Sequence, residues 1–149
     1  MNTKLLFAIL GVSSLAASAF AGERVKIWPK GLMPCFQPHQ IAAMTDEKEK
    51  GNEPYLEWFD PPAKPNGTCM ILISGGSYSA CCDVDLIKAW RERFTAIGCQ
   101  CVNFVYRTPR PKGLPIWQTA WQDGQRAVRM VRADAAKRGF DPNKIGTVS

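Results

Sequence analysis

The pattern of apolar and polar residues divides the chain after residue 67 into alternating strands and helices. Residues 68–73 and 99–106 are nearly continuous apolar runs, which are typical of strands buried on both faces of a sheet. Residues 83–97 and 117–138 instead repeat their apolar positions at helical spacing. Residues 144–149 form a further short run with strand character. These segments predict the order β–α–β–α–β.

Both predicted helices carry signals at their ends. Asp83 can cap the start of the first helix, and Gly98 and Gly139 can end the first and second helices. The residues predicted to face the core are Val84, Ile87, Trp90, Phe94 and Ile97 in the first helix and Ala120, Trp121, Gly124, Ala127, Val128, Val131 and Ala135 in the second.

Two shorter strands, at 25–28 and 55–59, are predicted before this unit. An irregular stretch separates them, and the turn-rich segment 60–67 follows the second. Alternation of strands and helices favours parallel strands joined by right-handed crossovers. The predicted fold class is therefore α/β, with a doubly wound and mostly parallel sheet.

The first 21 residues have the pattern of a signal peptide. Residues 1–4 are a short n-region made basic by Lys4, residues 5–17 are an apolar h-region, and Ala19-Phe20-Ala21 is a small-x-small cleavage site. The apolar run is shorter than the roughly 20 residues of a membrane span. We expect cleavage after Ala21, a mature domain over 22–149, a secreted or periplasmic location and no membrane attachment afterwards. The alternative is a buried N-terminal helix.

The formal charge of +6 is mild for 149 residues and indicates no nucleic-acid partner. Arg126, Arg129 and Arg132 share one helical stripe, which is expected to be a solvated face; the alternative is an anion site.

The cysteines of an exported chain suggest disulfides, although the sequence does not choose among pairings. Three of them lie in apolar runs and are expected to be small buried residues. No cysteine or histidine spacing points to a metal site, so no metal is expected. The six are Cys35, Cys69, Cys81, Cys82, Cys99 and Cys101.

Four short stretches, taken in order, carry a resemblance to a known superfamily. They are IWPKG at 27–31, ISGGSY at 73–78, VYR at 105–107, and DGQRAV followed by GFDPNKIG within 123–146. Together they resemble the α/β-hydrolase superfamily, and more closely its secreted acetyl-xylan and feruloyl esterases. The resemblance covers nearly all of the mature chain. It implies an α/β-hydrolase sheet that is incomplete at the C-terminus.

The resemblance assigns a role to the glycine-rich loop. Backbone N–H groups fixed beside the substrate stabilise the negative charge that develops during ester cleavage. Gly76 and Ser77 would supply such groups, and Gly75 and Tyr78 would line the substrate side. Ser77 replaces the third glycine of the superfamily pattern, so it would be strained at positive φ; Ser74 replaces a proline or histidine. The alternatives are an ordinary glycine turn and a Tyr78 that only packs the loop.

Other residues of these stretches are expected to be structural. Asp123 and Arg126, on the long helix, could tie the Tyr106-Arg107 loop to the body of the domain by charge-assisted hydrogen bonds.

The catalytic triad of the superfamily is not among these residues. Ser149 falls where the first glycine of a G-x-S-x-G elbow stands, so the nucleophile would follow it. His39 precedes the sheet core and is expected in a surface loop, whereas the triad histidine follows the nucleophile.

The predicted function is that of a truncated serine esterase for ester-substituted carbohydrates, inactive alone. In full-length form its partner would be a small-molecule or polysaccharide ester, and no cofactor is expected. The alternatives are an exopeptidase of the prolyl-oligopeptidase type and a non-catalytic secreted fragment.

Overall fold

The computed structural model describes residues 22–29, 32–34, 53–59, 62–81, 84–108 and 113–149. The predicted signal peptide, His39, Cys35 and Cys82 lie outside the described residues.

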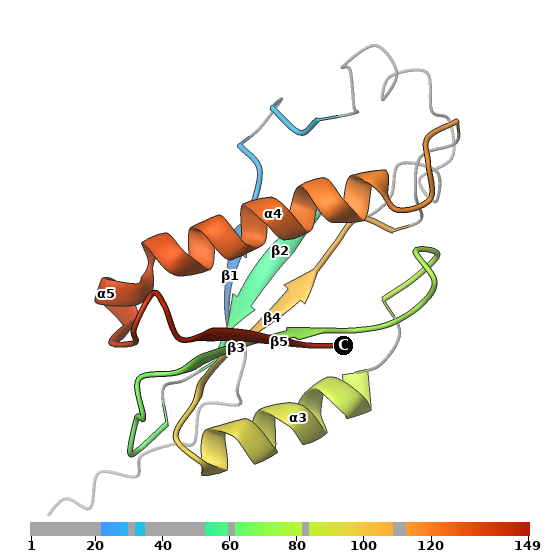
Figure 1. The fold of residues 1–149 in the computed structure, drawn as a ribbon. Coiled ribbons are helices and arrows are strands. Elements are labelled where there is room, and N and C mark those ends of the chain that lie inside the picture. The colour runs from blue at the N-terminus through green and yellow to red at the C-terminus, as the bar shows by residue number, and fades with distance from the viewer. Residues whose placement is uncertain (1–21, 30–31, 35–52, 60–61, 82–83, 109–112) are drawn as a thin grey trace, which may run out of the picture.

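One five-stranded sheet forms the centre of the described structure (Figure 1). Its spatial order is β1-β2-β4-β3-β5. β3 pairs in parallel with β4 and β5, whereas β2 pairs antiparallel with β1 and β4. The strands are β1 (Glu23–Lys26), β2 (Tyr55–Trp58), β3 (Cys69–Ile73), β4 (Gln100–Val105) and β5 (Ile145–Val148).

The prediction of a mostly parallel sheet is therefore wrong, because the sheet is mixed. Only the strands joined by helical crossovers are parallel, since a parallel connection needs a long return across the sheet. β1 and β2 precede the first such crossover and add to β4 as an antiparallel ribbon. The prediction of parallel strands with helices on both faces holds for β3, β4 and β5.

Two helices lie on opposite faces of the sheet: α3 (Val84–Ala96) and α4 (Gln118–Ala133) (Figure 1). The β3–β4 and β4–β5 crossovers step in opposite directions along the sheet. Right-handed crossovers therefore place the two helices on different faces. The helix predicted over 117–138 is divided at Asp134, and the short α5 (Ala135–Arg138) follows. Gly139, at φ 75°, ends it as predicted.

The apolar residues of β3 alternate between two cores. Ile71 packs in the larger core on the α4 side, with Phe104 and Val131, and Leu72 packs on the α3 side with Ile87. β3 is thus buried on both faces, which explains its unbroken apolar sequence.

The buried thiols of the sheet behave as small apolar residues, as predicted. Cys69, Cys99 and Cys101 are buried and free. Burial raises the pKa of the Cys69 and Cys101 thiols to about 12.

Two residues predicted to face the core are instead exposed. Ile97 follows the last residue of α3 and is 66% exposed. Trp121, on α4, is 64% exposed. Ile97 lies beyond its helix, so the helical periodicity no longer applies to it. Trp121 lies on a flank of α4 that no described element covers.

Candidate functional site

The loop after β3 has a backbone that requires glycine at one position. Gly76 has φ 143°, and its carbonyl oxygen accepts hydrogen bonds from the amides of Ser79 (2.9 Å) and Ala80 (3.3 Å). A Cβ on Gly76 would lie 2.0 Å from the Ala80 oxygen. No side chain fits there without moving the backbone of the turn.

The next two residues both adopt the left-handed backbone conformation although neither is glycine. Ser77 has φ 51° and Tyr78 has φ 61°. The strain expected at Ser77 is therefore present. Non-glycine residues held in this region cost about 1–3 kcal/mol each and occur often where ligands bind. Among the described residues, none accepts a hydrogen bond from the amide N–H of Gly75, Gly76 or Ser77.

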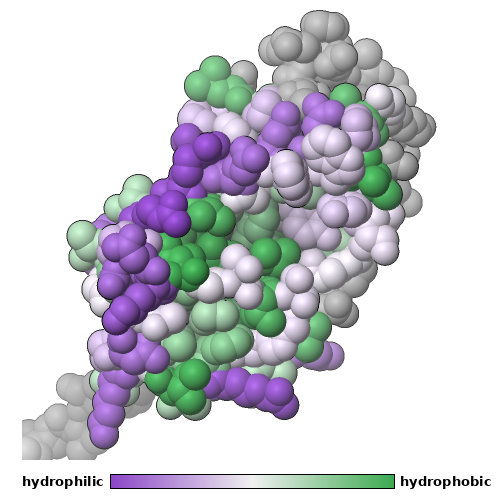
Figure 2. Space-filling view, in the orientation of Figure 1, coloured by the Kyte–Doolittle hydropathy of each residue, from purple (hydrophilic) through white to green (hydrophobic). Residues whose placement is uncertain are grey.

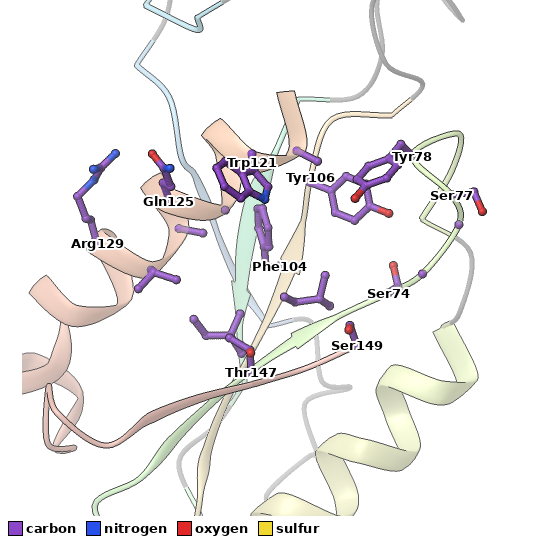
Figure 3. A pocket seen from close by; sticks show the side chains of 18 residues that line it. Ser74, Ser77, Tyr78, Phe104, Tyr106, Trp121, Gln125, Arg129, Thr147 and Ser149 are labelled. Atoms are coloured by element: carbon purple, nitrogen blue, oxygen red, sulfur yellow. The ribbon is translucent and has the colours of Figure 1, made fainter. Parts of the chain in front are cut away.

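A cleft of about 870 Å³ opens beside this loop, between α4 and the end of β5 (Figure 3). The four residues predicted for the site, Gly75 to Tyr78, all line it, as does Ser149. Tyr78 and Tyr106 form one end, with ring centroids 6.2 Å apart. Most of the remaining wall is apolar. It consists of Ile71, Ile73, Ser74, Phe104, Ala120, Trp121, Gly124, Gln125, Ala127, Val128, Arg129 and Thr147.

A buried ion pair fixes the loop that follows β4. Arg107 is 1% exposed and Asp123 is 0% exposed. The Arg107 guanidinium donates to both carboxylate oxygens, from Nη2 to Oδ1 at 2.7 Å and from Nε to Oδ2 at 2.9 Å. The Arg107 amide also donates to Oδ2 at 3.1 Å. This network ties the end of β4 to α4, as predicted for Asp123.

Further hydrogen bonds extend the network to the N-terminal segment. Trp28 Nε1 donates to Asp123 Oδ1 at 2.7 Å, and Arg107 Nη1 donates to the Pro34 carbonyl at 2.6 Å. These bonds satisfy groups that would otherwise be costly to bury. No sequence pattern indicated Trp28 as a partner of Asp123, since the two are far apart along the chain.

Arg126 hydrogen-bonds elsewhere and not to the described residues of the Tyr106-Arg107 loop, so that part of the prediction is wrong. Its Nε donates to the Ile27 carbonyl at 3.0 Å, and its guanidinium lies 5.5 Å from the Trp28 ring centroid. In the same stripe, Arg132 is exposed and donates to the Pro142 carbonyl at 3.3 Å. Arg129 is exposed at the border of the cleft.

Within the described part of the chain, no group of His, Cys, Asp and Glu side chains is arranged to hold a metal ion. No helix of that part has the length and apolar character needed to cross a membrane.

Comparison with known proteins finds structures with a similar fold. An acetyl ester-xyloside bifunctional hydrolase from Caldicellulosiruptor lactoaceticus superposes with TM-score 0.62 and 23% identity, covering 85% of this chain and 41% of that one. The butyrate-bound esterase Est2 of the Planctomycetes species Thermogutta terrifontis gives TM-score 0.58 and 19% identity, covering 85% and 39%.

A sequence relative is the endo-1,4-beta-xylanase B of Butyrivibrio fibrisolvens. It is 31% identical over 77 residues, which are 52% of this chain and 12% of the xylanase. The sequence matches no protein-family model. The chain thus spans less than half the length of these relatives. What it shares with the two hydrolase structures is part of the α/β-hydrolase fold.

Proposed function

We propose that this chain is the oxyanion-binding part of a serine esterase that acts on ester-substituted carbohydrates. The observation that carries the proposal is the loop at Gly76 and Ser77. Its backbone is held at positive φ, its amides have no acceptor among the described residues, and it faces the cleft beside the end of β5.

In this proposal the backbone amides of Gly76 and Ser77 donate hydrogen bonds to the carbonyl oxygen of the ester. Negative charge grows on that oxygen as the tetrahedral intermediate forms. Donors that are already fixed stabilise the charge without reorganising. The strain at Ser77 and Tyr78 is consistent with donors held in one orientation.

The apolar wall of the cleft suits the acyl group of the ester. Phe104 and Tyr106 pack against each other, with ring centroids 6.1 Å apart, and both line the cleft. The Thermogutta terrifontis structure contains butyrate, a short acyl group of the kind that such a wall would accept. Tyr78 would contact the carbohydrate side of the substrate.

The nucleophile, acid and histidine of the reaction would come from polypeptide beyond Ser149. Ser149 itself lies at the end of β5 and lines the cleft, where the turn to the nucleophile would begin. The proposal includes export, through cleavage of residues 1–21.

The test compares the purified chain with a complex that also contains the complementary part of a similar hydrolase. The second component is the part of the Caldicellulosiruptor lactoaceticus enzyme that lies C-terminal to the residues superposing on β5. We expect buffer-level rates for the chain alone and release of acetate from acetylated xylan by the complex. Prolyl p-nitroanilide is the substrate for the exopeptidase alternative and should not be cleaved. Turnover by the chain alone that Ser149→Ala abolishes would show that the nucleophile is misplaced.

A further inference from the structure

The turn that leads into β3 contains an exposed asparagine followed by glycine, Asn66-Gly67. It lies at the end of the sheet where β3 begins, opposite the glycine-rich loop, and no residue of this turn lines the cleft. Figure 2 shows hydrophilic side chains at this end of the molecule, at the lower left, whereas apolar side chains gather beneath α4. The pair is therefore separate from the surface to which the proposed function assigns the substrate.

Hydrogen bonds fix the side-chain amide of Asn66 from two directions. Its Oδ1 accepts a hydrogen bond from the backbone amide of Thr68 at 2.9 Å, which closes an Asx-turn around Gly67. Its Nδ2 donates to the Ile97 carbonyl oxygen at 2.9 Å and lies 3.5 Å from Cys99 Sγ. An Asx-turn folds the side chain back toward the following peptide, so the amide carbon Cγ lies on the side of the Gly67 nitrogen. The bond to Oδ1 polarises the carbonyl group of which Cγ is part.

The backbone nitrogen of Gly67 is free to act as a nucleophile. Among the described residues none accepts a hydrogen bond from its N–H, although its carbonyl oxygen accepts one from the Asp141 amide at 2.9 Å. Gly67 has φ 80°, and no atom lies within 4 Å of the place that a Cβ would occupy. Because glycine has no side chain, nothing on the residue itself shields this nitrogen from Cγ of Asn66.

We propose that Asn66 is a site of spontaneous deamidation in the folded chain. The Gly67 nitrogen loses its proton to solvent base and attacks Asn66 Cγ, so that a bond forms between these two atoms. The bond from Cγ to Nδ2 then breaks, and Nδ2 leaves as ammonia after taking up a proton from water. Water opens the resulting cyclic imide at either carbonyl carbon, which gives aspartate or isoaspartate at position 66. The inference does not depend on the proposed function.

The new carboxylate would oppose the contacts that Asn66 makes. One of its oxygens would replace Nδ2 beside the Ile97 carbonyl oxygen, and two acceptors without a hydrogen between them repel each other. The Asn66 amide also donates to the Gly98 carbonyl at 2.8 Å, and a Cβ on Gly98 would collide with the Lys64 carbonyl oxygen. Isoaspartate adds an atom to the main chain, which such close packing does not accommodate. Deamidation should therefore loosen the contact between the turn before β3 and the turn after α3.

A second asparagine of the same chain is the matched control. Asn143 is also exposed, but Lys144 follows it, and the Lys144 amide donates to the Asp141 carbonyl at 3.0 Å. The purified chain is incubated at low concentration and mildly alkaline pH, digested under mildly acidic conditions, and analysed by peptide mass spectrometry. We expect position 66 to convert to aspartate and isoaspartate at least tenfold faster than position 143. Gly67→Ala should slow the conversion, because its Cβ shields the nitrogen.

The chain unfolded in urea shows whether the folded turn permits the reaction or prevents it. Conversion of Asn66 in urea but not in the folded chain would overturn the inference, as would equal rates at positions 66 and 143. Asn66→Asp should lower the urea midpoint of unfolding. Asn143→Asp should change it little, because the Asn143 side chain has no hydrogen bond with a described residue. Equal midpoints for the two variants would overturn the predicted loosening.

Discussion

Gly76 is the residue on which the proposed chemistry depends most. Its φ of 143° and the 2.0 Å approach of a Cβ to the Ala80 oxygen mean that Gly76→Val must shift the turn. In the active complex we expect kcat to fall about 10²–10³-fold, since losing one oxyanion donor costs roughly 2.7–4 kcal/mol. KM should change little, because the charge exists chiefly in the transition state.

The control for Gly76 is the neighbouring position. Ser77→Gly relieves a non-glycine φ of 51° and keeps the amide, so the complex should stay active. Steady-state kinetics on both variants, with circular dichroism to confirm folding, decide the matter. A folded Gly76→Val complex with kcat within about twofold of the wild type would mean that the loop is only a turn.

The buried thiols predict a loss of stability at high pH. The pKa of Cys69 and Cys101 rises from 9.0 in the reference state to about 12 in the fold, chiefly through burial. Between these values the unfolded chain releases thiol protons that the folded chain retains. The free energy of unfolding should therefore fall as the pH rises from about 9 toward about 12.

The pH effect is measured as a difference between proteins, because lysines and tyrosines titrate in the same range. Urea unfolding of the wild type and of Cys101→Ala is compared at several pH values. The decline above pH 9 should be shallower in the variant. Parallel curves would show that the Cys101 thiol ionises as readily in the folded state as in the unfolded one.

Single residues were predictable where a local rule determines them. The strain at Ser77 followed from a non-glycine residue in a glycine loop, and Asp123 was predicted to tie the Tyr106-Arg107 loop to the helix. Trp121 was predicted wrongly, because helical periodicity marks apolar residues without showing what covers them. Its exposure depends on which other elements are present, and a periodic pattern does not contain that information.

At the scale of elements, the Arg107–Asp123 pair joins β4 to α4 and should dominate the stability of that junction. Asp123→Asn leaves the Arg107 guanidinium buried without its counter-charge. Removing one partner of a buried pair costs about 3–5 kcal/mol. We expect a lower denaturant midpoint for Asp123→Asn, measured by urea unfolding.

A surface pair provides the comparison for Asp123. Arg24 Nε lies 2.9 Å from Glu57 Oε1, and the Arg24 side chain is 63% exposed. Exposed pairs contribute about 0–1 kcal/mol, because water and salt screen them. Arg24→Met should therefore cost far less than Asp123→Asn. Equal losses would indicate that burial adds nothing to the Arg107–Asp123 pair.

Most helices and strands could be predicted from the sequence, but the antiparallel pairing of the first two strands could not. Each strand and helix from β3 to β5 falls within its predicted run, because burial on both faces and helical spacing leave distinct patterns. β1 and β2 are four residues each, and so short an alternation gives no pairing direction. Their antiparallel pairing depends on the connections and on β4, which are properties of the assembled sheet.

At the scale of the whole molecule, the free edge of β5 and the apolar cleft beside it should make the isolated chain associate. β5 pairs with β3 on one side, and no described strand pairs with its other side. An exposed strand edge next to an apolar surface favours pairing between chains. We expect concentration-dependent aggregation of the purified chain in light scattering, and its suppression when the complementary half is bound.

A positive charge on the β5 edge should reduce that association, because it opposes pairing of this edge with a second chain. Thr147 is exposed near the end of β5, and a lysine there would oppose strand pairing as it does on natural edges. Thr147→Lys should raise the concentration at which light scattering begins several-fold. Ala96→Lys adds the same charge at the exposed end of α3, away from the edge, and should change it little. If both variants raise it equally, net charge rather than the β5 edge governs association, and the edge is not the surface through which copies of this chain meet.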